Sequence, residues 1–326
     1  SMLINAGETK NVGVELTVNT VNFSTKKFSW NTTLTLSHNK NSVKALTGEA
    51  VQLYEARFGF NQNTHRIAVG EPLGQFYGYI TEGLYQVDDF NYDASTQTYT
   101  LKDGIPYHGD KGRIRPGMWK FKNLAGDDNV IDENDKTVIG NAQPKFYGGL
   151  NNSFTYKGFD LSIFLTFSYG NEVLNATKLV TSKVGSLNYN ALDVMNSSNR
   201  WMTINSDGQK VTDPGELAAL NAGKTVAAYH DAQQGDNYIH SWAVEDASYL
   251  KLSNVTLGYT FPKNLIARVG LKNLRLYATG NNLLTWTKYS GFDPEVSTMK
   301  SGLTPGVDFG AYPLSRSFIF GLNVAF

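Results

Sequence analysis

The sequence predicts an all-β fold, an antiparallel transmembrane β-barrel segment with long extracellular loops, and three observations lead to it. Seven stretches alternate apolar residues with small or polar ones at a period of two, which is typical of strands. The connections between these stretches are alternately short and very long. No apolar run approaches the roughly 20 residues of a membrane helix, whereas barrels cross membranes with alternating strands.

The seven stretches follow one another along the whole chain. The first four are NVGVELTVNT, FSWNTTLTLSHNK, KFYGGLNNSFTYK and FDLSIFLTFSYG. The next are SNVTLGYTFP, the more weakly alternating NLRLYATGNNLL, and the terminal SRSFIFGLNVAF. In the terminal stretch one parity carries the large apolar side chains: Phe318, Phe320, Leu322, Val324 and Phe326. The last residue of the chain is therefore also the last residue of an apolar strand face.

The short connections all fall at one end of the predicted sheet. They are residues 22–27, the tight turn at Lys157-Gly158, and residues 262–273, where NLIAR is expected to form one helical turn. The long connections are about residues 40–144, 169–248 and 284–313. Loops of this length argue against a compact soluble domain. An outer-membrane barrel, in contrast, has short periplasmic turns and long extracellular loops.

A soluble β-sandwich is the alternative, because its strands also alternate. Sandwich strands mix Lys, Glu and Arg into their exposed parity, whereas the polar parity here consists mainly of Gly, Ser, Thr and Asn. Such small polar residues suit a crowded or water-filled lumen. Aromatic residues also gather beside the short turns, as an interfacial girdle requires. These features favour the barrel.

Composition excludes several classes of function. Lys plus Arg equals Asp plus Glu at 29 each in 326 residues, so no net field attracts nucleic acid. The chain contains no cysteine, which excludes disulfides and thiolate chemistry. The five histidines show no zinc-site spacing, and no nucleophile elbow or phosphate-binding loop occurs in a supporting context. We therefore expect a protein that is not an enzyme.

Seven strands leave an open sheet, whose edges would expose unpaired backbone groups to lipid. Single-chain bacterial barrels have even strand numbers, with both termini on the periplasmic side. We therefore expect residues 1–326 to form one domain, the C-terminal segment of a larger barrel. The remainder would lie in another chain or outside this sequence.

Several ordered motifs resemble one family. They include VGEPLGQFYGY, the run from IDENDKTVIGNAQPKFYGG to FDLSIFLTFSYGN, SYLKLSNVTLGYTFP, and LRLYATGNNLLTWTKYSGFDPEVS. From about residue 10 to the end, the chain is similar to the C-terminal half of SusC-like TonB-dependent outer-membrane transporters. The resemblance implies the last seven strands of a 22-stranded barrel, with the plug domain and the TonB box absent from this chain. The terminal strand also resembles the signal read by the barrel-assembly machinery.

The resemblance further implies a function and partners. Members of the family sit in the outer membrane of Gram-negative bacteria and import oligosaccharides, sometimes peptides, beneath a hinged SusD-like surface lipoprotein. TonB-ExbB-ExbD supplies energy through the missing N-terminal part. We expect a glycan importer of this kind, with the rest of the barrel, the plug and lipid as further partners and no nucleic acid. The alternatives are a peptide importer of the same family and a surface β-rich glycan-binding module.

Only one stretch suggests a metal site, and no cofactor is expected to be required. NLAGDDNVIDENDK offers oxygen ligands of the kind that Ca²⁺ prefers: Asn123, Asp127, Asn129, Asp132 and Asp135. The stretch resembles an acidic segment of the family, but it has one extra residue, and Asp128 stands where glycine would make the sharp turn. The alternative is a turn rich in Asp and Asn that satisfies its own backbone.

Exposed aromatic residues in the long loops are the ligand-binding candidates, because flat rings pack under sugar faces. The candidates are Tyr77, Tyr79, Tyr85, Trp119, Trp201, Trp242, Trp286 and Tyr289. The alternatives for each are loop packing, the membrane girdle and the lid interface. For Tyr289, Phe292, Asp293 and Glu295 in TKYSGFDPEVS, bracing of an extracellular loop is favoured over substrate contact.

Overall fold

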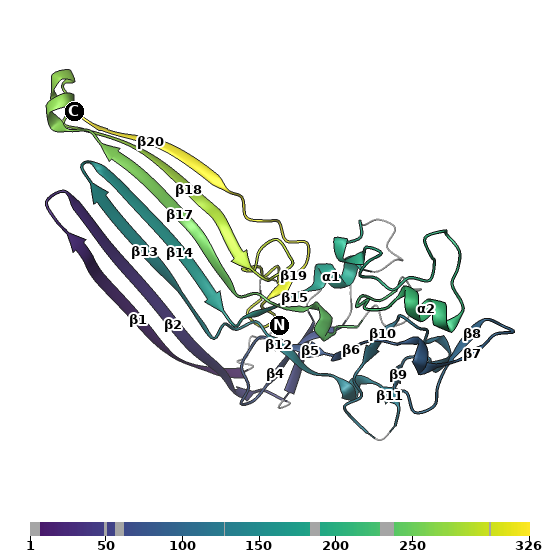
Figure 1. Cartoon of the computed structure of the whole chain (residues 1–326). Coiled ribbons are helices and arrows are strands. Elements are labelled where there is room, and N and C mark those ends of the chain that lie inside the picture. The colour runs from purple at the N-terminus through teal and green to yellow at the C-terminus, as the bar shows by residue number, and fades with distance from the viewer. Residues whose placement is uncertain are drawn as a thin grey trace, which may run out of the picture.

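A long curved antiparallel sheet and an assembly of folded loops at one of its ends make up the chain (Figure 1). The computed structural model describes residues 7–48, 51–55, 62–126, 128–182, 190–228, 238–299 and 301–326. In sheet order the strands are β1 (Gly7–Ser24), β2 (Phe28–Leu46), β13 (Phe146–Tyr156), β14 (Phe159–Tyr169), β17 (Tyr249–Thr260), β18 (Asn273–Thr287) and β20 (Ser317–Ala325). The seven predicted strands and their antiparallel order are confirmed, and the first two strands are longer than expected.

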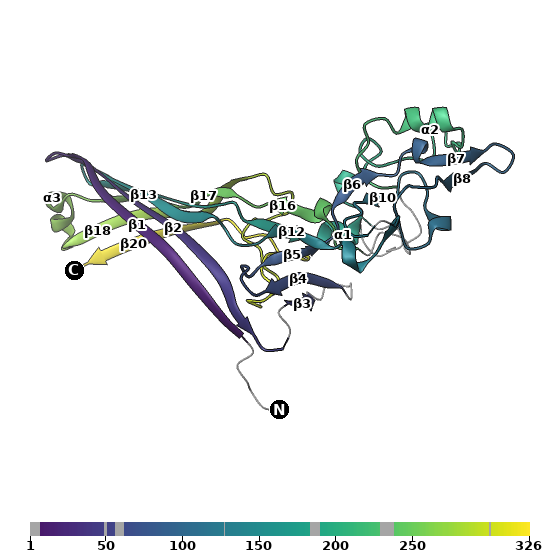
Figure 2. The same ribbon diagram turned by 90° about the horizontal axis from the view of Figure 1, so that it is seen from below.

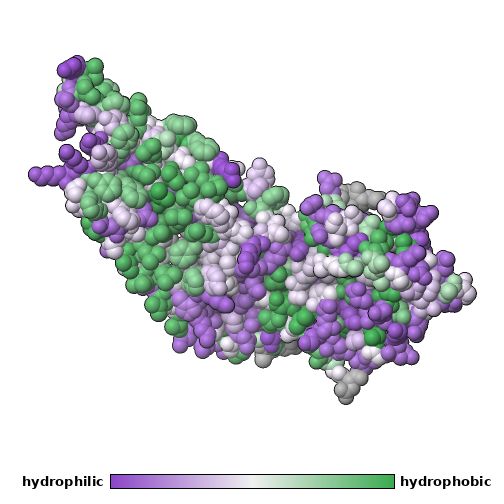
Figure 3. Space-filling view, in the orientation of Figure 1, coloured by the Kyte–Doolittle hydropathy of each residue, from purple (hydrophilic) through white to green (hydrophobic). Residues whose placement is uncertain are grey.

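The register aligns the alternating residues into continuous rows. Leu34, Leu150, Leu165 and Leu252 are neighbours across four strands, so their side chains share one face of the sheet. We call this the apolar face, and it is visible as the continuous green area over the strands in Figure 3. Much of it is exposed in this chain, with Val14 at 71% and Phe320 at 81%.

The opposite, polar face carries cross-strand hydrogen bonds between small side chains. Ser162 donates to Asn151 Oδ1 at 3.0 Å, and the hydroxyls of Thr256 and Thr279 lie 2.9 Å apart. Near the short turns, a Cβ added to Gly321 on β20 would lie 2.1 Å from the ring of Tyr277 on β18. Glycine at this position therefore allows the ring to lie flat across the terminal strand.

All short connections lie at the end of the sheet far from the loop assembly (Figure 2). The chain reverses tightly at Lys157 and Gly158, which both have positive φ. Between β17 and β18 it forms α3 (Lys263–Ile266) and the 3-10 turn η6 (Ala267–Val269), which confirms the predicted helical turn. No helix among the described residues is long and apolar enough to cross a membrane.

The long loops have secondary structure of their own, which the sequence pattern did not predict. The first loop forms a four-stranded sheet of β12 (Thr137–Asn141), β5 (Gln75–Gly78), β4 (Asn63–Ala68) and β3 (Val51–Glu55). Its small ladders are β6 (Thr81–Leu84) with β10 (Trp119–Phe121), β7 (Phe90–Asp93) with β8 (Thr98–Leu101), and β9 (Tyr107–His108) with β11 (Val130–Ile131). The elements are too short to show a periodic pattern.

The second and third loops meet in a three-stranded sheet. It contains β16 (Val244–Asp246), β15 (Glu172–Asn175) and β19 (Val307–Asp308) in that order. The helices are α1 (Ala176–Thr181) and α2 (Pro214–Leu220), with 3-10 turns η1 (Val87–Asp89), η2 (Lys111–Arg113), η3 (Glu133–Asp135), η4 (Asp193–Met195) and η5 (Ser241–Ala243). Buried apolar clusters join the loops, one of them centred on Phe76, Leu174 and Val307. The core of the chain therefore lies in the loop assembly, not in the long sheet.

Candidate functional site

The predicted ligand-binding aromatics are mostly inside the loop core. The prediction of exposed rings is wrong for five of the eight, which are at most 5% exposed: Tyr79, Tyr85, Trp119, Trp201 and Tyr289. They are buried because the loops form apolar clusters of their own, and these large side chains make up much of those clusters. A buried ring cannot stack on a ligand unless the loop opens.

Three of the predicted rings pack around one aromatic cluster. Tyr79 stacks on Phe121 with 5.3 Å between ring centroids, and Trp119 lies 4.9 Å from Trp242 and 5.0 Å from His240. These rings come from the first and second loops and hold them together. Loop packing, the alternative given for these residues, describes their contacts.

The remaining predicted rings are more accessible. Tyr77 and Trp242 are half-buried, and Trp286 is exposed. Trp286 lies on β18 opposite Leu250, so it continues the apolar face of the long sheet. None of the eight lines either of the two cavities described below.

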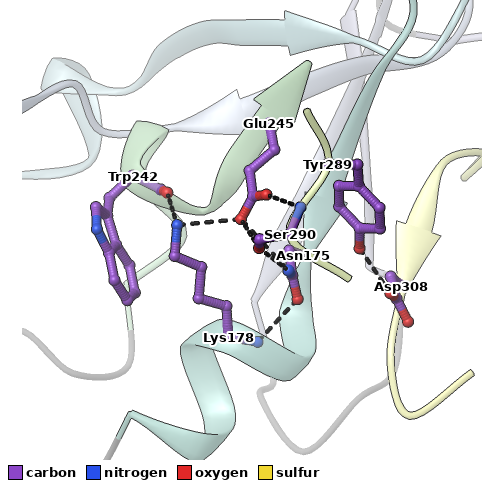
Figure 4. A network of polar contacts seen from close by, with 7 residues as sticks. All are labelled: Asn175, Lys178, Trp242, Glu245, Tyr289, Ser290 and Asp308. Atoms are coloured by element: carbon purple, nitrogen blue, oxygen red, sulfur yellow. Dashed lines mark hydrogen bonds and ion pairs between the residues drawn. The ribbon is translucent and has the colours of Figure 1, made fainter. Parts of the chain in front are cut away.

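A partly buried polar network joins the second and third loops (Figure 4). Asn175 caps α1, and its Oδ1 accepts a hydrogen bond from the Lys178 backbone N–H at 2.9 Å. Lys178 lies in the first turn of this capped helix. Its ammonium group donates to Glu245 Oε1 and to the Trp242 carbonyl, both at 3.0 Å. The same ammonium lies 4.1 Å from the centre of the Trp242 ring.

Glu245 is the centre of this network. Its Oε2 accepts from the Ser290 backbone N–H at 2.9 Å, and its Oε1 accepts from the Ser290 hydroxyl at 2.8 Å. Burial alone would raise the pKa of Glu245, but the Ser290 donors and the Lys178 charge outweigh it and hold that pKa below its usual value. The carboxylate therefore stays ionised, and its hydrogen bonds to Ser290 connect the second loop to the third.

Tyr289 forms a second connection within the third loop. Its hydroxyl donates to Asp308 Oδ2 at 2.6 Å, and both residues are at most 5% exposed. Burial, followed by this hydrogen bond to a carboxylate, raises the pKa of Tyr289 far above its ordinary value. Glu295 likewise accepts from Tyr249 and pairs with Lys251 at the end of β17. Tyr289 thus contacts Asp308 within the third loop, Glu295 connects this loop to β17, and the bracing role stays a prediction.

Two cavities lie beside this network and beside the sheet. A small one of about 120 Å³ is lined by Asn175, Ser290 and Asp308 of the network and by the exposed Phe292. A larger open cleft of about 710 Å³ lies where β2 and β13 part, above their last pair, Tyr147 and Ser37. The cleft is rich in amide and charged groups: Asn39, Lys40, Asn41, Glu71, Asn141, Gln143, Lys145, Glu172 and Asp246. Both cavities offer groups that bind hydroxyls.

Three histidines are buried in the loop core. Burial lowers the pKa of His65 to about 4, against the raising effect of its bond to the Pro305 carbonyl. Burial also lowers the pKa of His108 to about 4, and burial with the charge of Lys178 lowers that of His240 to about 3. Neither ring nitrogen of His108 has a hydrogen-bond partner among the described residues.

In the described residues, the acidic stretch folds as a turn whose side chains hydrogen-bond to its own backbone. The Asp135 carboxylate, 1% exposed, accepts from the backbone N–H groups of Leu124, Ala125 and Asp132. Asp132 accepts from the Asn134 N–H, and Asn123 donates to the Asp128 carbonyl. No group of three or more acidic or histidine side chains in the described ranges is arranged to hold a metal, and Asp127 lies outside them. Calcium binding stays a prediction.

The network residues were missed by sequence reasoning. Asn175, Lys178, Glu245 and Asp308 are spread over two loops that show no alternation, and nothing in their local sequence separates them from solvated charges. One signal was present, since Asn175 precedes a short apolar-periodic run in the manner of a helix cap. Four of the terminal residues proposed as an assembly signal lie on β20, a sheet edge, and continue the apolar face: Phe318, Phe320, Leu322 and Val324. Phe326 follows the end of this strand.

Comparison with known proteins identifies the family. TonB-dependent receptor P3 of Formosa agariphila is 33% identical over 333 residues, which cover all of this chain and 30% of that receptor. TonB-dependent receptor SusC of Bacteroides thetaiotaomicron is 27% identical over 338 residues, covering all of this chain and 27% of SusC. The chain belongs to the SusC-like TonB-dependent receptors. No protein-family model matches the chain.

The fold of this SusC-like segment also matches a solved structure. The RagAB peptide importer in its open-open state gives a TM-score of 0.68 at 20% identity, over 98% of this chain and 29% of that chain. The chain thus spans about 30% of the length of its relatives. The matched sequences are named TonB-dependent receptors, and the solved structure of similar fold is a peptide importer.

Proposed function

We propose that this chain forms part of the wall and the outer mouth of a TonB-energised nutrient importer in the outer membrane of a Gram-negative bacterium. One observation carries the proposal: the seven-stranded sheet has a continuous exposed apolar face and a polar opposite face, with all long loops at one end. Lipid hydrocarbon solvates such a face favourably, whereas in water the face would be a large exposed apolar patch, which is unfavourable. The polar face then lines the lumen.

The remaining parts of the importer lie outside this chain. The sheet needs further strands at β1 and β20 to satisfy its edges, and the rest of the barrel supplies them. The family membership supports a plug that fills the lumen, energy from TonB-ExbB-ExbD, and a SusD-like lipoprotein over the loops. The folded loop assembly offers that lipoprotein a rigid surface at the outer end.

We favour oligosaccharides over peptides as the substrate. The open cleft of about 710 Å³ gathers amide side chains with charged groups of both signs, a set that hydrogen-bonds to hydroxyl groups without selecting one charge. The charges of both signs are also compatible with a peptide backbone, so the peptide importer stays the second candidate. Its support is the similar fold of the RagAB peptide importer.

Extraction of the intact complex from outer membranes tests this function. Mass spectrometry in detergent should find these residues within a larger receptor, together with a lipoprotein. Uptake of labelled oligosaccharides into cells should require both components and an intact TonB. Recovery of the residues from the soluble fraction, monodisperse without detergent, would contradict the importer and favour a surface binding module.

A further inference from the structure

The small cavity of about 120 Å³ beside the polar network has a polar floor and an aromatic rim. Asn175 and Asp308 in its floor are at most 5% exposed, and their positions are fixed by β15 and β19, in which they are direct neighbours. Figure 4 shows the side chains of Asn175 and Asp308, with Ser290 beside Asn175. Phe292 lines the cavity from its outer side and is 79% exposed.

The floor retains unused acceptor capacity. Among the described residues, Asp308 Oδ2 accepts one hydrogen bond, from Tyr289, and Oδ1 accepts only a long one of 3.3 Å from the Ala311 N–H. Each carboxylate oxygen can accept two, so both have room for a further donor from the cavity. Within the part of the chain that the structure describes, Asn175 Nδ2 makes only long contacts of 3.4 Å, to Glu245 and Ser290. Adjacent hydroxyls of a ligand match such a carboxylate and amide pair.

The backbone holds the rim open. A Cβ at Gly291 would lie 2.4 Å from the Tyr289 ring, so only glycine lets the chain turn here and present Phe292 outward. Gly310, on the opposite side, has a positive φ of 62° and no side chain to fill the cavity. An aromatic ring that is exposed to this degree buries little of its area unless a ligand or partner covers it.

We propose that this cavity binds a single pyranose unit of an oligosaccharide, with the ring of Phe292 against the apolar face of the sugar and Asp308 accepting from its hydroxyls. The inference rests on the proposed importer and names the chemistry of one subsite. The volume is well below the roughly 300 Å³ at which ligand pockets begin, so it holds one unit and not a chain. An apolar amino-acid side chain would fit the space but would displace water from the remaining acceptor positions of Asp308 without replacing its hydrogen bonds, which is costly.

The test uses the intact receptor with its lipoprotein, purified in detergent. A glycan array identifies a bound oligosaccharide, and calorimetry then measures its Kd for wild type and variants. Phe292→Ala should weaken binding about tenfold or more, which corresponds to the roughly 1.4 kcal/mol of one lost stacking contact. Phe292→Trp should restore it. Tyr312→Ala is the matched control, because Tyr312 is 86% exposed in the same loop and does not line the cavity.

Asp308→Asn supplies the second variant. The side-chain amide keeps one oxygen as an acceptor for the Tyr289 hydroxyl but has an NH2 group in place of the second oxygen. The variant should therefore bind the oligosaccharide more weakly, with a melting temperature within a few degrees of wild type. If wild type binds an oligosaccharide and Phe292→Ala binds it equally well, the subsite is wrong while the importer stands. If wild type binds a peptide mixture and no glycan on the array, both the subsite and the glycan form of the proposed function are overturned.

Discussion

Acid should open the loop core of the receptor while leaving the long sheet intact. Three histidines lie in that core with pKa values of about 4, 4 and 3, against 6.5 for an exposed histidine. Because the folded state holds them neutral, the stability that they contribute is complete above pH 6.5. It is lost as the pH falls from 6.5 toward 4, where the unfolded loops bind protons that the folded core does not.

The size of the effect follows from the pKa differences. Each histidine costs about 1.4 kcal/mol for every pH unit below 6.5, or about 2 kcal/mol at pH 5. Three such groups give a loss on the order of 6 kcal/mol between pH 7.5 and pH 5. This is comparable to the whole stability of a small domain, so the loop assembly should open locally.

His108 allows the contribution of one ring to be separated. The ring packs 4.9 Å from Phe121 and 5.5 Å from Tyr238, so phenylalanine can replace it at little steric cost. His108→Phe removes two buried nitrogens that have no partner in the described part of the chain, and it should stabilise the loops by about 1 kcal/mol at pH 7.5. Between pH 7.5 and pH 5 the loop core of the variant should lose about 4 kcal/mol of stability, since two titrating histidines remain.

Hydrogen exchange on the intact receptor measures both quantities. Peptides covering residues 107–121 should lose protection at pH 5 after correction for intrinsic rates, whereas peptides covering residues 159–167 should keep it. His38→Phe is the control, because His38 lies on β2 outside the loop core. Equal protection of residues 107–121 at both pH values, or an unchanged pH dependence in His108→Phe, would refute the reasoning.

Three further predictions follow from the contacts. Lys178→Met should destabilise residues 172–181 by about 3 kcal/mol in hydrogen exchange, because it leaves the Glu245 side chain, only 13% exposed, without its cation, whereas Lys111→Met at an exposed pair should have no measurable effect. Calcium should raise the melting temperature of the receptor if the acidic loop binds it, and an unchanged melting temperature across the titration would end that hypothesis. Phe326→Ala should lower the amount of receptor assembled in outer membranes, measured by heat-modifiable gel mobility, and equal assembly would exclude Phe326 from the signal.

The long sheet was predictable because its pattern is repeated and local. Residues such as Leu161, Ile163 and Leu165 alternate with polar neighbours over a full strand, and the same period recurs seven times. Period and loop length together then give the topology. The alternation also predicts which side chains share the apolar face of the sheet, since a strand has only two faces.

The loop assembly could not be predicted for an equally physical reason. Its strands have two to six residues, which is too short for a period to be recognised, and its core depends on contacts between distant loops. Trp201 is buried against residues of the first loop, and Glu245 gains its role only because Ser290 and Lys178 meet it in space. A sequence shows that an aromatic residue is in a loop, but not whether that loop forms its own core.

Accessibility along β14 tests the central claim that one face of the sheet lies against lipid. Nitroxide labels can be attached to single cysteines introduced from residue 159 to 167 of the intact receptor in bilayers, and this chain adds no cysteine of its own. The account predicts that labels at the odd positions, including Ile163, are relaxed by oxygen dissolved in lipid. Labels at the even positions, including Ser162, should respond to a water-soluble nickel complex. Equal access of the nickel complex to both parities would contradict the membrane barrel.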